Sequence, residues 1–366
     1  MKPSLLLIVP FVAFFTACGP VSPPTVQPSY LDEAPAHFPL ARGEAGPDDI
    51  GLFLAGKPVR FGTALSRLQQ TVEYQEHVRE MDALWRSNGK PRVNRMKEWS
   101  NNELLPFTGG AYTVWYPFGG PDLLHATAMF PHARTYALMG LEPVGDLPAL
   151  ESLPPGEVLA ALTAFRQATR TQLQAGYFIT QDMRQDLQRS ALRGVTPILV
   201  STIAMTGGMV ESVQNTKVAG YPAVSVAFRD DAGMRRTAFY VEGDLSNKGF
   251  TSTYQAWLPG LGRGYTYFKA ASYLMHDERF SQARDFFLSQ SRGILQDDSG
   301  IPFRHFQNGW TIRYHGRYEQ PIPLFAKHRQ DDLRAAYAAN PTSPLPFGSG
   351  YHLDEWDANL IFATKP

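Results

Sequence analysis

One strand–helix–strand segment constrains the fold of this chain more than any other feature. Tyr112–Phe118 is a run of β-branched and aromatic residues that predicts a strand, and Gly119-Gly120 predicts a turn. Pro121–Phe130 begins with a proline suited to a first helical turn, and Thr135–Glu142 predicts a second strand. Two strands joined by a helix in this way lie parallel in one sheet, so the chain must build a sheet covered by helices.

The rest of the chain supplies further elements. Apolar residues at helical spacing predict helices at Ala64–Ser87 (stopped by Asn88-Gly89), Gly156–Gln174, Lys269–His276, Gln282–Ser291 and Gln330–Ala339. Apolar and β-branched runs predict strands at Pro197–Ala204, Ala223–Phe228, Thr237–Val241, Trp310–Tyr314 and Asn359–Ala363. Because Asp230–Gly233 separates two of these strands, they are expected to form an antiparallel hairpin. The expected fold class is therefore α/β (mixed α+β): a three-layer-like mixed sheet with a parallel βαβ start and an antiparallel hairpin in the second half.

Composition excludes several classes of protein. The 366 residues include 34 basic and 34 acidic side chains and are 43% hydrophobic, which favours an ordered core over disorder. A net charge of zero argues against a nucleic-acid partner, since such binding needs a basic surface. A single cysteine excludes a disulfide framework and any multi-cysteine metal site.

That cysteine ends an apolar N-terminal segment. Lys2 precedes the uncharged run Leu5–Phe15, which is too short to span a bilayer and is typical of a secretory signal. Thr16-Ala17-Cys18-Gly19 resembles the lipobox of bacterial lipoproteins, although Phe15 stands where leucine is usual. The resemblance implies cleavage before Cys18 and acylation of its thiol. The alternative is a plain signal peptide with an incidental cysteine.

The lipoprotein resemblance also implies a location. Residues 1–17 would be the signal peptide, 18–49 a lipidated, proline-rich tether, and 50–366 a single mixed α/β domain. Gly19 after the cysteine implies the outer membrane, with the domain facing the periplasm. The membrane would thus be a partner through the N-terminal lipid.

The βαβ segment allows two ligand hypotheses. Glu142 lies 22 residues after Gly120, where nucleotide sites keep an acid for a ribose hydroxyl, but a full GxGxxG is missing and Asp122 is negative where a phosphate would bind. Asp122 and His125 share a helix face and could begin a metal site. The further candidate ligands for such a site are His132, Glu142, His276, His305 and His315. Ordinary helix-start and hydrogen-bonding roles are the simpler interpretation, and we expect neither metal nor cofactor.

A third candidate site is the segment from Gln296 to His305. Asp297 and Asp298 could split their pKa values and act as acid and base, with Ser299, Arg304 and His305 close in sequence. The same residues are also typical of a turn. Further tyrosine, histidine and lysine side chains follow or precede this segment, namely Tyr314, Lys269 and His276.

Function is less constrained than fold. G-x-S-x-G, H-E-x-x-H and P-loop patterns do not occur, and aromatic residues make up 12% of the chain. The first hypothesis is a lipid-anchored envelope protein that binds or scaffolds a glycan, peptide or protein. The alternative is an envelope hydrolase with acid–base groups drawn from Asp122, His125, Glu142, Asp297, Asp298 and His305. Convergence of these groups in one place would favour the enzyme.

Overall fold

The computed structural model describes residues 44–110, 112–176, 192–306 and 309–365. Contacts between residues divide the chain into Met1–Glu33 and Ala34–Pro366, and all of the described residues belong to the second unit. The expected signal peptide and the lipidation site at Cys18 lie outside the described residues.

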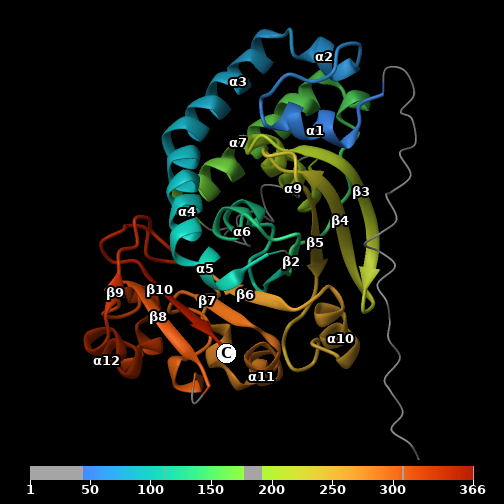
Figure 1. Ribbon diagram of the computed structural model, residues 1–366. Helices are drawn as coiled ribbons and strands as arrows, with labels where there is room; N and C mark the ends of the chain where they lie inside the picture. Colours follow the sequence, from blue (N-terminus) through green and yellow to red (C-terminus); the bar gives the residue numbers. More distant parts are fainter. Residues whose placement is uncertain (1–43, 111, 177–191, 307–308, 366) are drawn as a thin grey trace, which may run out of the picture. The chain divides into compact units, whose positions relative to one another are not determined.

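The sheet is mixed. Its strands are β1 (Thr113–Tyr116), β2 (Thr135–Gly140), β3 (Met209–Val218), β4 (Tyr221–Arg229), β5 (Arg235–Glu242), β6 (Gly264–Phe268), β7 (Gly293–Gln296), β8 (Thr311–Gly316), β9 (Thr342–Ser343) and β10 (Asn359–Thr364). They form one sheet in the order β3-β4-β5-β2-β1-β6-β7-β10-β8-β9 (Figure 1). β5, β2, β1, β6 and β7 run parallel, whereas β10 is antiparallel to both of its neighbours. β3, β4 and β5 are joined as antiparallel hairpins.

Helices cover both faces of the sheet. They are α1 (Pro47–Leu54), α2 (Ala64–Leu68), α3 (Val72–Leu84), α4 (Lys90–Glu103), α5 (Leu105–Thr108), α6 (Leu123–Met129), α7 (Pro155–Ala175), α9 (Thr196–Met205), α10 (Ser252–Gly260), α11 (Ser281–Gln290) and α12 (Asp331–Ala339). Short 3-10 turns lie at Leu150–Ser152, Leu274–His276, Glu278–Phe280, Phe303–His305 and Pro323–His328, and a π-helical turn lies at Trp85–Gly89. No helix in the described ranges has both the length and the apolar character needed to cross a membrane.

The core consists of two main layers on opposite faces of the sheet. Val114 and Tyr116 of β1 face α4, α6 and α9, while Trp115 between them faces α10 and α11. Figure 1 shows these two groups of helices on opposite sides of the sheet. A third cluster joins α1, α3 and α7 around Phe53 and Phe165. The expected α/β class, the parallel βαβ start and the antiparallel hairpin are confirmed.

The helix predicted from Ala64 to Ser87 is wrong in its bounds. The helix breaks between α2 and α3, where Thr71 caps the second helix with its side chain. Asn88-Gly89 does not stop it, because Gly89 has a φ of −73° and leads through the π-helical turn into α4. A Cβ at Gly89 would overlap the ring of Trp85. The glycine therefore serves close packing rather than a left-handed stop.

Two other sequence predictions are wrong. Pro197–Ala204 is not a strand but most of α9, whose residues are all buried. An all-round apolar pattern marks a buried helix as well as a buried strand, and Pro197 suits a first helical turn. Lys269–His276 is not a helix, because Ala270, Ser272 and Tyr273 have φ values of 50°, 51° and 54°. Only Leu274–His276 forms a 3-10 turn there.

Candidate active site

Charged residues collect where the parallel strands end. After β1, the chain adds the strands β2 to β5 on one side of β1. It then returns and places β6 on the other side of β1. In open parallel sheets, ligands bind outside the carboxyl ends of the strands at such a reversal. The residues that follow the strands at this edge are Asp122 after β1, Glu142 after β2, Lys269 after β6, and Asp297 and Asp298 after β7.

Asp122 is the centre of the site. It caps α6, where one carboxylate oxygen accepts from the backbone N–H of His125 (3.3 Å) and lies 2.7 Å from His125 Nδ1. The other oxygen lies 2.6 Å from Lys269 Nζ and accepts from the Tyr116 hydroxyl at 2.9 Å. Gln172 of α7 adds a donor at 3.3 Å. All five side chains are buried, so Asp122 ties together three segments distant in sequence.

Burial and charge set the protonation of this centre. Burial alone would raise the pKa of Asp122, but the charges and hydrogen bonds of His125 and Lys269 hold it well below its usual range. Burial lowers the pKa of His125 to about 4, against the attraction of Asp122. Burial also lowers the pKa of Lys269. Near neutral pH the centre therefore contains a carboxylate and a neutral imidazole that shares its Nδ1 proton with that carboxylate.

The loop after β6 holds Lys269 in place. Lys269 Nζ also donates to the backbone carbonyl of Gly176. Ala270 donates its N–H to Asp297 (2.9 Å) and Ala271 donates its N–H to Ser299 Oγ (2.8 Å). These bonds fix the left-handed backbone at Ala270, a conformation that costs free energy and concentrates at functional sites.

The carboxylates of Asp297 and Asp298 have different partners. Asp297 accepts from the N–H (2.9 Å) and the hydroxyl (2.5 Å) of Ser299, and its pKa is raised to about 6 by burial and by the charge of Asp298. Asp298 accepts from the hydroxyl of Tyr273 at 2.6 Å, and its other oxygen lies 3.6 Å from His352 Nε2. The two acids therefore connect the β6 loop to the C-terminal segment.

His352 completes this connection. Its Nδ1 lies 3.2 Å from a carboxylate oxygen of Asp357. Burial alone would lower the pKa of His352, but Asp298 and Asp357 outweigh burial and raise it to about 9. Near neutral pH His352 is therefore a cation held between two carboxylates.

Glu142 lies at the same edge of the sheet. Its carboxylate accepts from the hydroxyl of Tyr240 at 3.0 Å. A Cβ added to Gly120, which has a φ of 56°, would lie only 3.3 Å from that carboxylate. Glu142 thus packs against the turn that leads to Asp122. The start of α6 is not open to a phosphate, however, because the carboxylate of Asp122 already accepts from the N–H of His125.

Comparison with known protein families gives no match, and comparison with curated proteins gives none either. The geometry of the site is therefore the basis for assigning a function to this chain.

The remaining sequence candidates lie outside the Asp122 centre. His276 packs its ring 5.2 Å from that of Tyr273, and burial, together with the nearby His328 and Arg304, lowers its pKa to about 3, so it is neutral near neutral pH. Arg304 and His305 lie near His276 rather than near Asp122. Tyr314 packs against Tyr337 on the opposite face of the sheet and belongs to the core.

The metal hypothesis receives no further ligand from the structure. His132 is bonded to Asn101 at 3.0 Å rather than placed beside His125. Within the described ranges, no three histidine, cysteine or acidic side chains are arranged to hold a metal ion.

Several residues of the site have no counterpart among the sequence candidates, among them Tyr116, Gln172, Tyr273 and His352. Tyr116 lies two residues before the end of the strand predicted at Tyr112–Phe118, and Tyr273 lies three residues before the candidate His276. The sequence therefore places both tyrosines near the candidate residues. Gln172 sits on a predicted helix and His352 in a glycine-rich loop. Nothing in their local sequence indicates that either contacts an acid.

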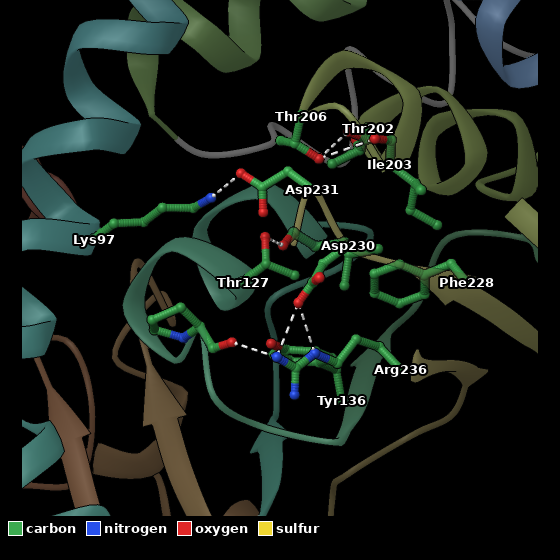
Figure 2. Close-up of a pocket in the computed structure, with 12 residues that line it drawn as sticks. Lys97, Thr127, Tyr136, Thr202, Ile203, Thr206, Phe228, Asp230, Asp231 and Arg236 are labelled. Carbon is green, nitrogen blue, oxygen red and sulfur yellow. Dashed lines mark hydrogen bonds and ion pairs between the residues drawn. The ribbon is translucent and has the colours of Figure 1, made fainter. Parts of the chain in front are cut away.

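A cavity at the opposite edge of the sheet is separate from the Asp122 centre, since none of Asp122, His125 and Lys269 lines it. Figure 2 shows it between α6, α9 and the starts of β2 and β5. Its charged residues are paired with one another, since Lys97 Nζ lies 3.1 Å from Asp231 and Arg236 lies 2.9 Å from Asp230 (Figure 2). Arg236 also donates to backbone carbonyls of the turn after α6. These contacts hold the turn between α6 and β2 against the start of β5.

Proposed function

We propose that this protein is an envelope hydrolase that cleaves an ester or amide bond with a water molecule activated by His125. The observation that carries the proposal is the shared Asp122 carboxylate, which binds both His125 and Lys269 in a buried position at the reversal of strand order. Burying an ion pair costs free energy in desolvation, so such a pair at a ligand-binding edge points to chemistry.

The roles follow from the protonation states. Asp122 accepts from Nδ1 of His125, which leaves the lone pair on Nε2 to take a proton from water. The oxygen of that water adds to the carbonyl carbon of the substrate as His125 takes the proton. The bond to the leaving group then breaks, and His125 returns the proton to that group. His125 is thus the catalytic residue and Asp122 a positioning residue.

Lys269 and the two carboxylates after β7 support this arrangement. Lys269 keeps Asp122 ionised, because its positive charge lies 2.6 Å from the carboxylate. Asp297 anchors the backbone next to Lys269 through Ala270 N. Its elevated pKa makes it a second group able to exchange a proton near neutral pH.

The binding-module hypothesis has less support. It requires an exposed aromatic patch without converging titratable groups. Trp115 is buried, and Trp257 and Trp310 pack against the core. Trp356 is 70% exposed, but it shares its groove with charged side chains, namely Arg92, Arg95, Asp354 and Glu355, and not with other exposed aromatic residues.

The experiment is a hydrolysis assay of the full-length protein. Wild type, His125→Gln and His132→Gln are compared on p-nitrophenyl butyrate and on peptide p-nitroanilides. We expect wild type and His132→Gln to release nitrophenol or nitroaniline at the same rate, because His132 lies outside the site. His125→Gln is expected to lose about 100-fold or more. Equal rates in all three proteins would refute the assignment, as would a wild type without activity on either class.

The location remains part of the proposal. Acylation of Cys18 would tether this hydrolase to the outer membrane and place it among envelope polymers. The environment would supply peptide and glycan substrates rather than nucleotides.

A further inference from the structure

An open groove lies next to the buried centre. It runs between the start of α4 and the segment from Phe347 to Trp356 and has a volume of about 500 Å³. Leu353 supplies exposed apolar lining, and the largely buried side chains of Leu173 and Phe347 lie behind the groove surface. Helix α4 and the red segment before β10 lie side by side in Figure 1. A groove of this size accepts a drug-sized molecule or a short peptide.

One wall of the groove is positively charged. Arg92 and Arg95 line it from α4, and neither has an ion pair with any residue in the part of the chain that the structure describes. Arg92 is the inner of the two, because its charge acts on Asp122, His125 and Lys269. Its guanidinium also lies against Gly176, whose carbonyl binds Lys269. Arg92 therefore joins the groove to the catalytic centre.

The opposite wall is negatively charged. Asp354 and Glu355 line it, both exposed, and neither has an ion pair within the described ranges. Trp356 follows them and is 70% exposed. No ion pair crosses between Arg92 or Arg95 and these acids, so four charges of two signs face the open groove.

We propose that this groove binds a zwitterionic ligand of the size of a short peptide. Its carboxylate lies against Arg92 and Arg95, its ammonium group against Asp354 and Glu355, and its apolar side chain against Leu353 and Trp356, which are 48% and 70% exposed. Guanidinium groups suit a carboxylate because they donate in a planar fork. The inference rests on the proposed function only in taking this ligand as the substrate class of the Asp122 centre.

The test is calorimetric binding of three tripeptides to the full-length protein: Ala-Leu-Ala, its N-acetyl form and its C-terminal amide. Wild type is compared with Arg92→Gln, Asp354→Asn/Glu355→Gln and Arg86→Gln. Arg86 is the matched control, since it pairs with Asp82 and does not line the groove.

We expect wild type and Arg86→Gln to bind Ala-Leu-Ala alike. Amidation should weaken binding about tenfold, and Arg92→Gln should weaken Ala-Leu-Ala equally while leaving the amide unaffected. N-acetylation should likewise weaken binding about tenfold. Asp354→Asn/Glu355→Gln should weaken the binding of Ala-Leu-Ala equally while leaving that of the N-acetyl peptide unaffected. Absence of binding at millimolar concentration, or binding that ignores the terminal charges, would overturn the inference.

Failure of the two proposals can be told apart. His125→Gln lies outside the groove, so it should bind Ala-Leu-Ala as wild type does. If binding is charge-dependent but no peptide or ester is cleaved, the hydrolase assignment is wrong and the zwitterion site stands. If hydrolysis depends on His125 but binding ignores terminal charge, the zwitterion site is wrong and the hydrolase assignment stands.

Discussion

Lys269 Nζ lies 2.6 Å from a carboxylate oxygen of Asp122, and both side chains are almost completely buried. The two residues are 147 positions apart in the sequence and follow the adjacent parallel strands β1 and β6. A buried pair of this kind is expensive to break from one side, because the remaining charge has no partner. The stability of the domain and the protonation of His125 therefore depend on the same contact.

Removal of either charge alone should destabilise the domain strongly. Lys269→Met leaves the carboxylate of Asp122 buried without its cation, and Asp122→Asn leaves the ammonium group unpaired. Each is expected to lower the free energy of unfolding by about 3–5 kcal/mol. Urea denaturation followed by circular dichroism measures this loss.

The double variant distinguishes a coupled pair from two independent effects. Asp122→Asn/Lys269→Met buries no unpaired charge, so its loss of stability should be well below the sum of the two single losses. Strict additivity of the three values would mean that the ion pair does not determine the stability of this edge.

The pH dependence of stability should reveal His352. Its pKa is about 9 in the folded protein against 6.5 when unfolded, so protonated His352 stabilises the fold fully below pH 6.5. This contribution disappears as the pH rises through 9. The difference in unfolding free energy between wild type and His352→Gln should be about 2 kcal/mol at pH 6 and shrink towards pH 9.5. A difference that grows with pH would contradict the Asp298–His352–Asp357 arrangement.

Gly350 should tolerate no side chain. Its φ is 60°, and a Cβ there would overlap the carboxylate of Asp297. Gly350→Ala is therefore expected to lower the melting temperature by several degrees, since it strains the backbone and displaces the loop that covers Asp297. Gly156→Ala is the matched control, because an added Cβ there meets no atom within 4 Å. An equal melting temperature for Gly350→Ala and wild type would show that Gly350 does not pack closely against the carboxylate of Asp297.

Membrane attachment should depend on Cys18. Cells that express wild type and take up a radioactive fatty acid should label the protein, whereas Cys18→Ser should remain unlabelled and leave the membrane fraction. Equal labelling of both would refute the lipoprotein assignment.

Local patterns predicted the fold class well. The β-branched and aromatic run before Gly119-Gly120 indicated β1, and the turn Asp230–Gly233 indicated the hairpin of β4 and β5. Pro197–Ala204 could not be assigned correctly, because a segment buried on every side has neither helical nor strand periodicity. The loop after Lys269 could not be predicted either, since its left-handed residues are held by contacts to Asp297 and Ser299.

The candidate site was predicted in its parts but not in its assembly. Asp122 and His125 were visible as a pair three residues apart on one helix. Their contact with Lys269 arises from the pairing of β1 with β6, and β6 is not among the predicted strands. Arg92 gave no signal of its own, because its importance comes from the groove beside it.

The most direct test of the account is the pH profile of kcat/KM for hydrolysis by wild type, measured over the range in which circular dichroism shows a folded protein. The account predicts that kcat/KM rises with pH to a plateau with a midpoint near 4, as His125 loses its proton, and that His125→Gln removes this limb together with the activity. Asp122→Asn should move the midpoint to lower pH, because the carboxylate raises the pKa of His125. Full activity in His125→Gln, with the same profile as wild type, would contradict the assignment of this buried centre as the active site.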